Sequence, residues 1–183
     1  MANEKDPVQK IKNLIRTIPN YPKDGVMFRD ITTLICHPEG LALVTDILTE
    51  QYINTNISKV AGIEARGFIF GSTLAQALHA GFVPIRKKGK LPAKIFSQEY
   101  QLEYGSDTLE IHADAVSSED NVLLVDDLLA TGGTAEAAVN LIEKCGGRVH
   151  HCCFVVNLPD LGGKNRLQEL GRSIFTVCEF EGE

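Results

Sequence analysis

The sequence lacks tryptophan, has no CxxC pair among its five cysteines, and contains no apolar run near the roughly 18 residues of a membrane span. Its first residues, Met-Ala-Asn-Glu-Lys-Asp-Pro, also lack the apolar core of a secretory signal. An odd number of cysteines without paired spacing is typical of a reducing compartment. We therefore expect a soluble, cytoplasmic protein that does not associate with a membrane.

A surplus of positive charge is absent as well. The chain has 18 lysines and arginines against 24 aspartates and glutamates, a formal net charge of −6. Such an acidic chain is a poor candidate for general nucleic-acid binding. Its 183 residues are 44% hydrophobic, which suffices for one domain with its own core. No repeat or low-complexity linker marks a boundary, so we expect a single domain over residues 1–183.

Short apolar runs alternate with amphipathic segments along most of the chain. The predicted strands cover residues 59–63, 82–85, 122–125, 154–156 and 174–177. The predicted helices cover residues 7–18, 38–53, 68–80 and 134–145. This alternation predicts an α/β fold with a doubly wound, mainly parallel sheet, in which ligands bind beyond the carboxyl ends of the strands.

Residues 93–112 interrupt this alternation. Apolar and polar residues alternate there on both sides of the turn sequence Gly105-Ser106-Asp107, which is the pattern of an antiparallel hairpin. We expect this hairpin to be inserted between parallel strands and to serve as a flap or an interface.

The strongest chemical signal is the segment 122–134, Val-Leu-Leu-Val-Asp-Asp-Leu-Leu-Ala-Thr-Gly-Gly-Thr. A buried strand delivers Asp126 and Asp127, which we expect at an exposed strand end, and a Thr/Gly-rich turn then opens into a helix. Backbone N–H groups in such a turn form an anion nest, and no lysine follows the glycines as in a Walker A loop. A phosphate beside two acids that can hold a diol or a metal ion indicates a sugar phosphate. The alternative is that the acids only solvate a strand end and Thr134 only caps a helix.

Two other segments carry polar groups. Glu64-Ala65-Arg66-Gly67 is a second strand-to-helix turn that could bind an anion, or an ordinary connection with a surface arginine. The basic run 86–94 is either a solvated face or a cationic lid that neutralises a leaving anion. By contrast, the run 150–153, His-His-Cys-Cys, is a poor metal site because adjacent strand residues point to opposite faces.

The segment 122–134 resembles the phosphoribosyl-pyrophosphate (PRPP) motif of the type I phosphoribosyltransferases, in particular of the members that use adenine. Segments 25–31, 62–68, 86–92 and 102–105 resemble the same branch in the same order. Such enzymes use Mg²⁺ in purine salvage and transfer ribose 5-phosphate from PRPP to adenine, giving AMP and pyrophosphate. The resemblance implies their fold, with an N-terminal hood for the base over residues 1–35, a flexible lid over 88–112, and a homodimer.

The resemblance also implies a role for each matching residue. The 5′-phosphate is expected at Ala130, Thr131, Gly132, Gly133 and Thr134, and the ribose hydroxyls at Asp126 and Asp127, directly or through Mg²⁺. Pyrophosphate is expected at Glu64, Ala65, Arg66, Arg86, Lys87, Lys90 and Tyr104, in a loop that often has a non-proline cis peptide. Adenine is expected at Met27, Phe28, Arg29 and Leu129, with Phe28 stacking on the base and backbone groups recognising its edge. The catalytic residues are then Arg66 and Glu103, and Glu103 would handle the purine N7 proton.

Three other functions stay open. A phosphoribosyltransferase for another base shares the PRPP motif, although the four further segments favour adenine. A PRPP-binding regulator would use the same fold as a sensor, and a structural α/β protein would keep only a vestigial site.

Overall fold

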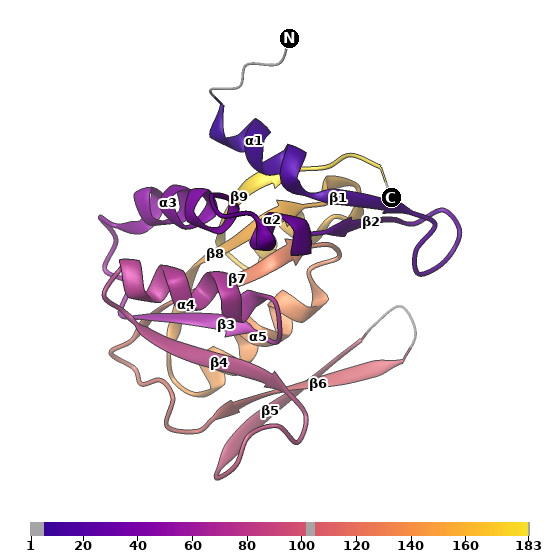
Figure 1. The fold of residues 1–183 in the computed structure, drawn as a ribbon. Helices are drawn as coiled ribbons and strands as arrows, with labels where there is room; N and C mark the ends of the chain where they lie inside the picture. The colour runs from indigo at the N-terminus through magenta and orange to yellow at the C-terminus, as the bar shows by residue number, and fades with distance from the viewer. Residues whose placement is uncertain (1–5, 102–104, 183) are drawn as a thin grey trace.

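A seven-stranded sheet forms the centre of the computed structural model, which describes residues 6–101 and 105–182 (Figure 1). The strand order is β5-β6-β4-β3-β7-β8-β9. The strands are β3 (Lys59–Ile63), β4 (Gly81–Lys87), β5 (Ile95–Gln101), β6 (Ser106–His112), β7 (Asn121–Leu129), β8 (Arg148–Asn157) and β9 (Ser173–Glu179). The pairs from β4 to β9 are parallel, whereas β6 is antiparallel to both β4 and β5. The mainly parallel sheet and the inserted hairpin are thus confirmed.

Helices cover both faces of this sheet, as a doubly wound fold requires. One face is covered by α3 (Gly40–Tyr52) and α4 (Gly67–Ala77), and the other by α5 (Gly133–Lys144). Residues of β7 alternate between the two buried clusters, so this strand is apolar on both sides. None of the described helices is long and apolar enough to cross a membrane.

The N-terminal part forms a separate small layer that contains α1 (Pro7–Leu14), β1 (Arg16–Pro19), β2 (Met27–Asp30) and α2 (Thr32–Cys36). The predicted helix 7–18 is wrong in its last third, because the helix ends at Leu14 and β1 pairs antiparallel with β2. β-branched residues directly before a proline favour an extended chain. Asp30 anchors this pairing, since hydrogen bonds from Thr32 and Arg16 lower its pKa to about 2.

The paired acids do not lie at an exposed strand end, contrary to the prediction. Strand β7 continues through them to Leu129, because β8 pairs with it as far as Asn157. The side chain of Asp127 is almost fully buried as a result. The neighbouring β8 carries the His-His-Cys-Cys run, in which Cys152 and Cys153 lie in opposite core clusters.

Two short elements follow β8, the 3₁₀ turn η1 (Pro159–Leu161) and the helix α6 (Gly163–Glu169). They return the chain to the carboxyl ends of β7 and β8, where the Gly163 N–H donates to the Ala130 carbonyl at 3.0 Å. The segment after β7 and the segment after β8 are therefore in direct contact.

Candidate functional site

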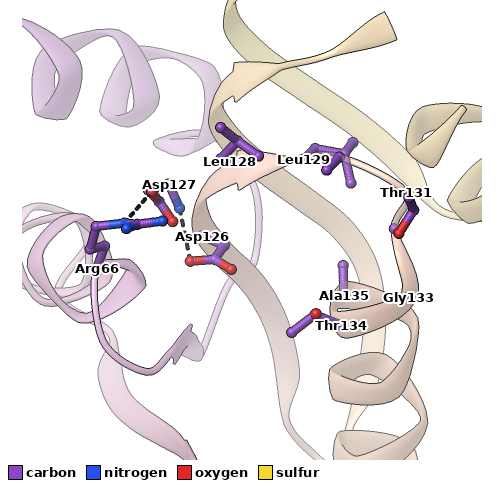
Figure 2. A pocket seen from close by; sticks show the side chains of 11 residues that line it. Arg66, Asp126, Asp127, Leu128, Leu129, Thr131, Gly133, Thr134 and Ala135 are labelled. Atoms are coloured by element: carbon purple, nitrogen blue, oxygen red, sulfur yellow. Dashed lines mark hydrogen bonds and ion pairs between the residues drawn. The ribbon is translucent and has the colours of Figure 1, made fainter. Parts of the chain in front are cut away.

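A pocket opens at the carboxyl end of β7 and is lined by Arg66 and residues 126–135 (Figure 2). Arg66 comes from the turn after β3, which is the parallel neighbour of β7. Because parallel strands end at the same edge of a sheet, this pairing brings the two predicted anion-binding turns together. Binding residues that lie 60 positions apart in the sequence thus share one pocket.

The phosphate loop, which we define as Ala130–Thr134, connects β7 to α5. Gly132 has a φ of +81°, a conformation that glycine adopts without strain. It has no side chain to cap α5, so the first N–H groups of the helix remain free to bind an anion. Thr134 lies inside the first turn of α5 and not at its cap, which removes the alternative that it only caps the helix.

The two acids differ in their partners although they are adjacent in sequence. Asp127 accepts a hydrogen bond from Arg66 Nε at 2.6 Å, shown as a dashed line in Figure 2. Asp126 accepts the N–H of Asp127 at 2.9 Å, and its Oδ1 lies against the backbone of Gly67. Burial and the nearby Asp127 charge raise the pKa of Asp126 well above its ordinary value. One guanidinium therefore faces two carboxylates, and the pocket has room for a further cation.

The turn before Arg66 contains a cis peptide between Glu64 and Ala65, a feature that the family often has in this loop and that the sequence could not show. The Glu64 carboxylate accepts hydrogen bonds from Arg86 Nε at 3.2 Å and from the Lys87 N–H at 3.0 Å. Burial opposes the charge of Glu64, but these bonds lower its pKa below the ordinary value. The Glu64 carboxylate thus fastens the turn to β4 through hydrogen bonds with Arg86 and Lys87.

The basic run is less free than its sequence suggests. Arg86 is paired with Glu64, and Lys87 forms an ion pair with Asp107 on the hairpin. The hydroxyl of Tyr100 accepts a further hydrogen bond from Lys87 Nζ at 3.2 Å. Lys90 is exposed, and its carbonyl accepts from Arg86 at 3.1 Å. The run is therefore no plain solvated face, because two of its cations tie the hairpin and the Glu64 turn to β4.

Three of the four predicted base-binding residues, Met27, Phe28 and Arg29, lie on β2. Phe28 is half-buried, and its ring meets Tyr21 edge to face at a centroid distance of 5.2 Å. The guanidinium of Arg29 turns toward the end of the chain, where it lies 4.6 Å from the Phe180 ring. It also donates to Thr17 Oγ1 at 2.6 Å. Since the Arg29 side chain is engaged in this way, β2 can offer a base its backbone groups and the Phe28 ring.

The prediction that Leu129 contacts a base does not fit the structure. Its side chain is 1% exposed and belongs to the core cluster under α5. Leu128 points to the opposite face, is half-buried, and packs against the cluster that includes Ile31 of the N-terminal layer. Strict alternation from Leu123 and Val125 would have placed Leu129 on that side, so the sequence pattern alone could not show that Leu128 faces the layer.

Glu103 and Tyr104, the predicted proton-handling residue and its neighbour, lie outside the described residues. The hairpin strands that precede and follow them, β5 and β6, pair over their whole lengths. Their expected roles therefore stay predictions. Among the residues that the structure does describe, no three His, Cys, Asp or Glu side chains gather as a metal-binding group.

Comparison with known proteins identifies relatives over nearly the whole chain. The family model for the phosphoribosyl transferase domain matches residues 32–178. Adenine phosphoribosyltransferase of Methylobacillus flagellatus is 57% identical over 171 residues, which is 93% of this chain and 97% of that protein. The Shewanella piezotolerans enzyme of the same name is 54% identical over 183 residues, all of both chains.

Solved structures give the same result. Adenine phosphoribosyltransferase from Rhodothermus marinus superposes with a TM-score of 0.88 at 48% identity and covers 95% of this chain and 98% of its own. The Saccharomyces cerevisiae enzyme, complexed with an imino-altritol bisphosphate and adenine, has a TM-score of 0.87 at 38% identity, with coverages of 94% and 98%.

Proposed function

This chain belongs to the adenine phosphoribosyltransferases within the phosphoribosyl transferase family, and from that premise we propose that it makes AMP in the pocket at the end of β7. It is a pentosyltransferase that transfers ribose 5-phosphate from PRPP to adenine and releases pyrophosphate. The observation that carries this assignment to the pocket is the meeting of an uncapped helix start, two carboxylates and one arginine in a single cavity.

The phosphate loop holds the 5′-phosphate of PRPP in this proposal. Its backbone N–H groups and the hydroxyls of Thr131 and Thr134 are the available donors, and the α5 dipole favours the negative charge. Asp126 and Asp127 accept hydrogen bonds from the ribose hydroxyls, which lie closer to the reacting carbon than the 5′-phosphate does. The order of groups along the pocket then matches the order of groups along a sugar phosphate.

A magnesium ion fits the donor set of this pocket. Mg²⁺ is commonly held by one or two carboxylates together with substrate phosphates, and here Asp126 and Asp127 outnumber the single Arg66 charge. When bound with PRPP, Mg²⁺ supplies charge that makes pyrophosphate a better leaving group. Among the residues that the structure describes, the pocket offers too few ligands for a closed metal cage, which suits an ion that arrives with its substrate.

The reaction breaks the C1–O bond to pyrophosphate and forms a bond from C1 to adenine N9, through a transition state with positive charge on the ribose. Positioning and electrostatic stabilisation supply the catalysis. Arg66 donates to the departing pyrophosphate, which requires its release from Asp127 or a sharing of its N–H groups. Glu103 handles the proton at purine N7 as the base attacks.

The N-terminal layer binds adenine between two apolar groups. Phe28 stacks on one side of the ring, and Leu128 replaces Leu129 as the apolar contact from β7 because its side chain faces that layer. The backbone near Met27 and Arg29 recognises the edge of the base. Recognition by backbone groups explains why the Arg29 side chain is free to bind Phe180.

The remaining parts of the proposal rest on the resemblance, except for the single domain and the cytoplasm, which rest on length, composition and cysteine spacing. They are a single domain with a hood over residues 1–35 and a mobile lid over 88–112, a homodimer, and a place in the cytoplasm. Sedimentation at saturating PRPP tests the homodimer, because a fully active monomer near 20.0 kDa would contradict it.

Incubation with PRPP, Mg²⁺ and a panel of purine and pyrimidine bases tests the function. We expect pyrophosphate release with adenine and little with the other bases. Turnover with a different base would reassign the substrate. Binding of PRPP without turnover of any base would support the alternative of a PRPP-sensing regulator.

A further inference from the structure

Helix α6 packs against the phosphate loop, and none of its residues lines the pocket. The Gly163 N–H donates to the Ala130 carbonyl at 3.0 Å, and Gly163 is buried. A Cβ atom placed on Gly163 would lie 2.2 Å from the Ala130 oxygen and 2.8 Å from the Gly132 nitrogen. Both of these atoms belong to backbone, so neither can swing aside as the end of a side chain could. Only glycine fits at position 163 while the loop keeps this conformation.

A second residue of α6 touches the loop through its side chain. The stem of Arg166 lies 3.3 Å from the point where a Cβ on Gly132 would stand, and its Nη1 lies 3.7 Å from the same point on Gly133. Its guanidinium forms an ion pair with Glu136 in the first turns of α5. Arg166 does not line the pocket, which is bounded by Arg66 and residues 126–135. Its contact with the loop therefore lies outside this pocket, in a neighbouring one that Arg166 lines together with Gly133 and Glu136.

The helix itself is held in place by groups that a ligand would not touch. Leu167 is fully buried in the cluster under α5. On the outer side, Lys164 Nζ lies 3.4 Å from Glu179, and Asn157 Nδ2 donates to the same carboxylate oxygen at 3.0 Å. These contacts fasten α6 to the ends of β8 and β9. The phosphate loop is thus fixed to the sheet at two places, through β7 and through α6.

We propose that Gly163 and Arg166 are positioning residues for the sugar phosphate, because together they hold the phosphate loop in the shape that presents its N–H groups. This inference rests on the proposed function, in which that loop binds the 5′-phosphate. A nest of backbone donors works only while several N–H groups converge on one point, so a shift of about 1 Å is costly even without loss of any ligand-touching group. Gly163 sets the distance from α6 to the loop. Arg166 contacts Gly132 and Gly133 of the loop and forms an ion pair with Glu136 of α5.

The main test is Gly163→Ala, with Asn165→Ala as the matched control on an exposed position of the same helix. We expect the KM for PRPP to rise about 10²-fold for Gly163→Ala, the scale of a small misplacement at a reacting site. The KM for adenine at saturating PRPP should stay near the wild-type value, because the base site lies on β2. The control should match the wild type in every parameter.

A milder pair of variants covers the case in which Gly163→Ala fails to fold. Arg166→Glu should raise the KM for PRPP about two- to fivefold, the scale of a partly exposed ion pair. The double variant Arg166→Glu with Glu136→Arg restores the pair in reverse and should return the KM toward the wild-type value. A direct phosphate contact by Arg166 would show no such rescue.

Calorimetric binding of ribose 5-phosphate separates this inference from the proposed function. If the wild type binds ribose 5-phosphate but does not turn over PRPP, the function is wrong, and weaker binding by folded Gly163→Ala still supports the positioning role. Unchanged PRPP and ribose 5-phosphate affinities in folded Gly163→Ala would overturn the inference. Equal losses for PRPP and adenine, in step with a fall in melting temperature, would also overturn it by showing a purely structural role.

Discussion

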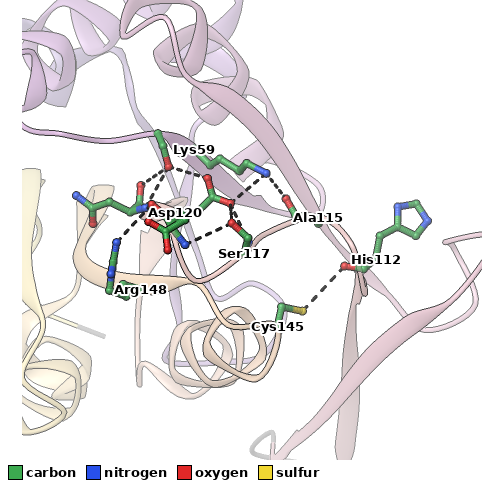
Figure 3. Close-up of polar contacts among 10 residues, drawn as sticks. Lys59, His112, Ala115, Ser117, Asp120, Cys145 and Arg148 are labelled. Atoms are coloured by element: carbon green, nitrogen blue, oxygen red, sulfur yellow. Dashed lines mark hydrogen bonds and ion pairs between the residues drawn. The ribbon is translucent and has the colours of Figure 1, made fainter.

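The two ends of β7 present aspartates in opposite electrostatic conditions. At the amino end, Asp120 accepts hydrogen bonds from the Ser117 N–H at 2.8 Å and from Ser58 Oγ at 2.9 Å, and it lies 3.3 Å from Lys59 Nζ (Figure 3). Burial opposes its charge, but these partners lower the pKa of Asp120 below the ordinary value. At the carboxyl end, burial and Asp127 raise the pKa of Asp126.

We infer from this difference that the Asp120 carboxylate stabilises the fold, whereas the Asp126 carboxyl serves to bind a ligand. The Asp120 carboxylate joins the turns before β3 and β7, and the backbone carbonyl of the same residue accepts the N–H of Arg148 at the start of β8. The Asp120 carboxylate thus forms its hydrogen bonds and its ion pair with other groups of the protein. Asp126 instead lies in a pocket where burial and Asp127 oppose its ionisation, an arrangement that is common at functional sites. The predictions below test whether substitutions at the carboxyl end of β7 change activity and substitutions at its amino end change stability.

The largest effect is expected from removing both carboxylates at the carboxyl end. Charge-assisted hydrogen bonds contribute roughly 1.5–3 kcal/mol each, so Asp126→Asn with Asp127→Asn should lower kcat/KM for PRPP by about 10²-fold or more. Circular dichroism should show a folded chain. Steady-state kinetics that give a near-wild-type kcat/KM for the folded double variant would refute the roles of both residues.

The two leucines after the acids should differ in the property that they affect. Leu129→Ala should lower the free energy of unfolding by about 2–5 kcal/mol, because it opens a cavity in the core. Leu128→Ala should leave stability closer to the wild type and raise the KM for adenine by roughly tenfold, the scale of an apolar contact in a pocket. Denaturant titration and adenine kinetics on both variants make the comparison. The assignment of Leu128 fails if Leu129→Ala alone weakens adenine binding.

Asp120→Asn should cost stability without changing the chemistry. Loss of charge-assisted bonds at a half-buried site is expected to lower the free energy of unfolding by about 1–3 kcal/mol, while kcat/KM per folded protein stays the same. Since the folded-state pKa of Asp120 lies below its unfolded value, its stabilisation is present above the unfolded pKa. It is lost as pH falls through the folded pKa, so the variant should show a weaker acid dependence of stability than the wild type. An identical pH profile would contradict this account.

The smallest effect is expected for the stability of Asp126→Asn at neutral pH. A raised pKa means that the folded state opposes ionisation of this carboxyl, so an uncharged amide should leave the free energy of unfolding unchanged or slightly higher. Thermal melts of Asp126→Asn and Asp120→Asn at pH 7 should therefore move in different directions. A clear loss of stability in Asp126→Asn would show that this end also serves the fold.

The parts of the site that could be predicted from sequence are the local ones. An apolar strand, two acids and a Thr/Gly turn into a helix lie within one short segment, so their arrangement follows from backbone periodicity and turn chemistry. The parallel sheet follows from the repeated alternation of strands and helices. Both features depend on neighbours in the chain.

The parts that could not be predicted depend on pairing between distant segments. The burial of Asp127 requires β8 to continue alongside β7, and β1 is completed as a strand by its pairing with β2. The partner of Lys87 is Asp107, 20 positions away across the hairpin. The contact of Gly163 with Ala130 gave no signal in the sequence, since a lone Gly-Gly pair indicates a turn and no particular partner.

Hydrogen–deuterium exchange with and without Mg²⁺–PRPP tests the comparison of the two ends most directly, in the wild-type protein and in one experiment. The account predicts slower exchange of the amides in residues 126–135 when the ligand is present, and unchanged exchange in residues 115–121. Unchanged exchange at 126–135, or equal protection of both segments, would contradict the claim that the carboxyl end of β7 is the PRPP site.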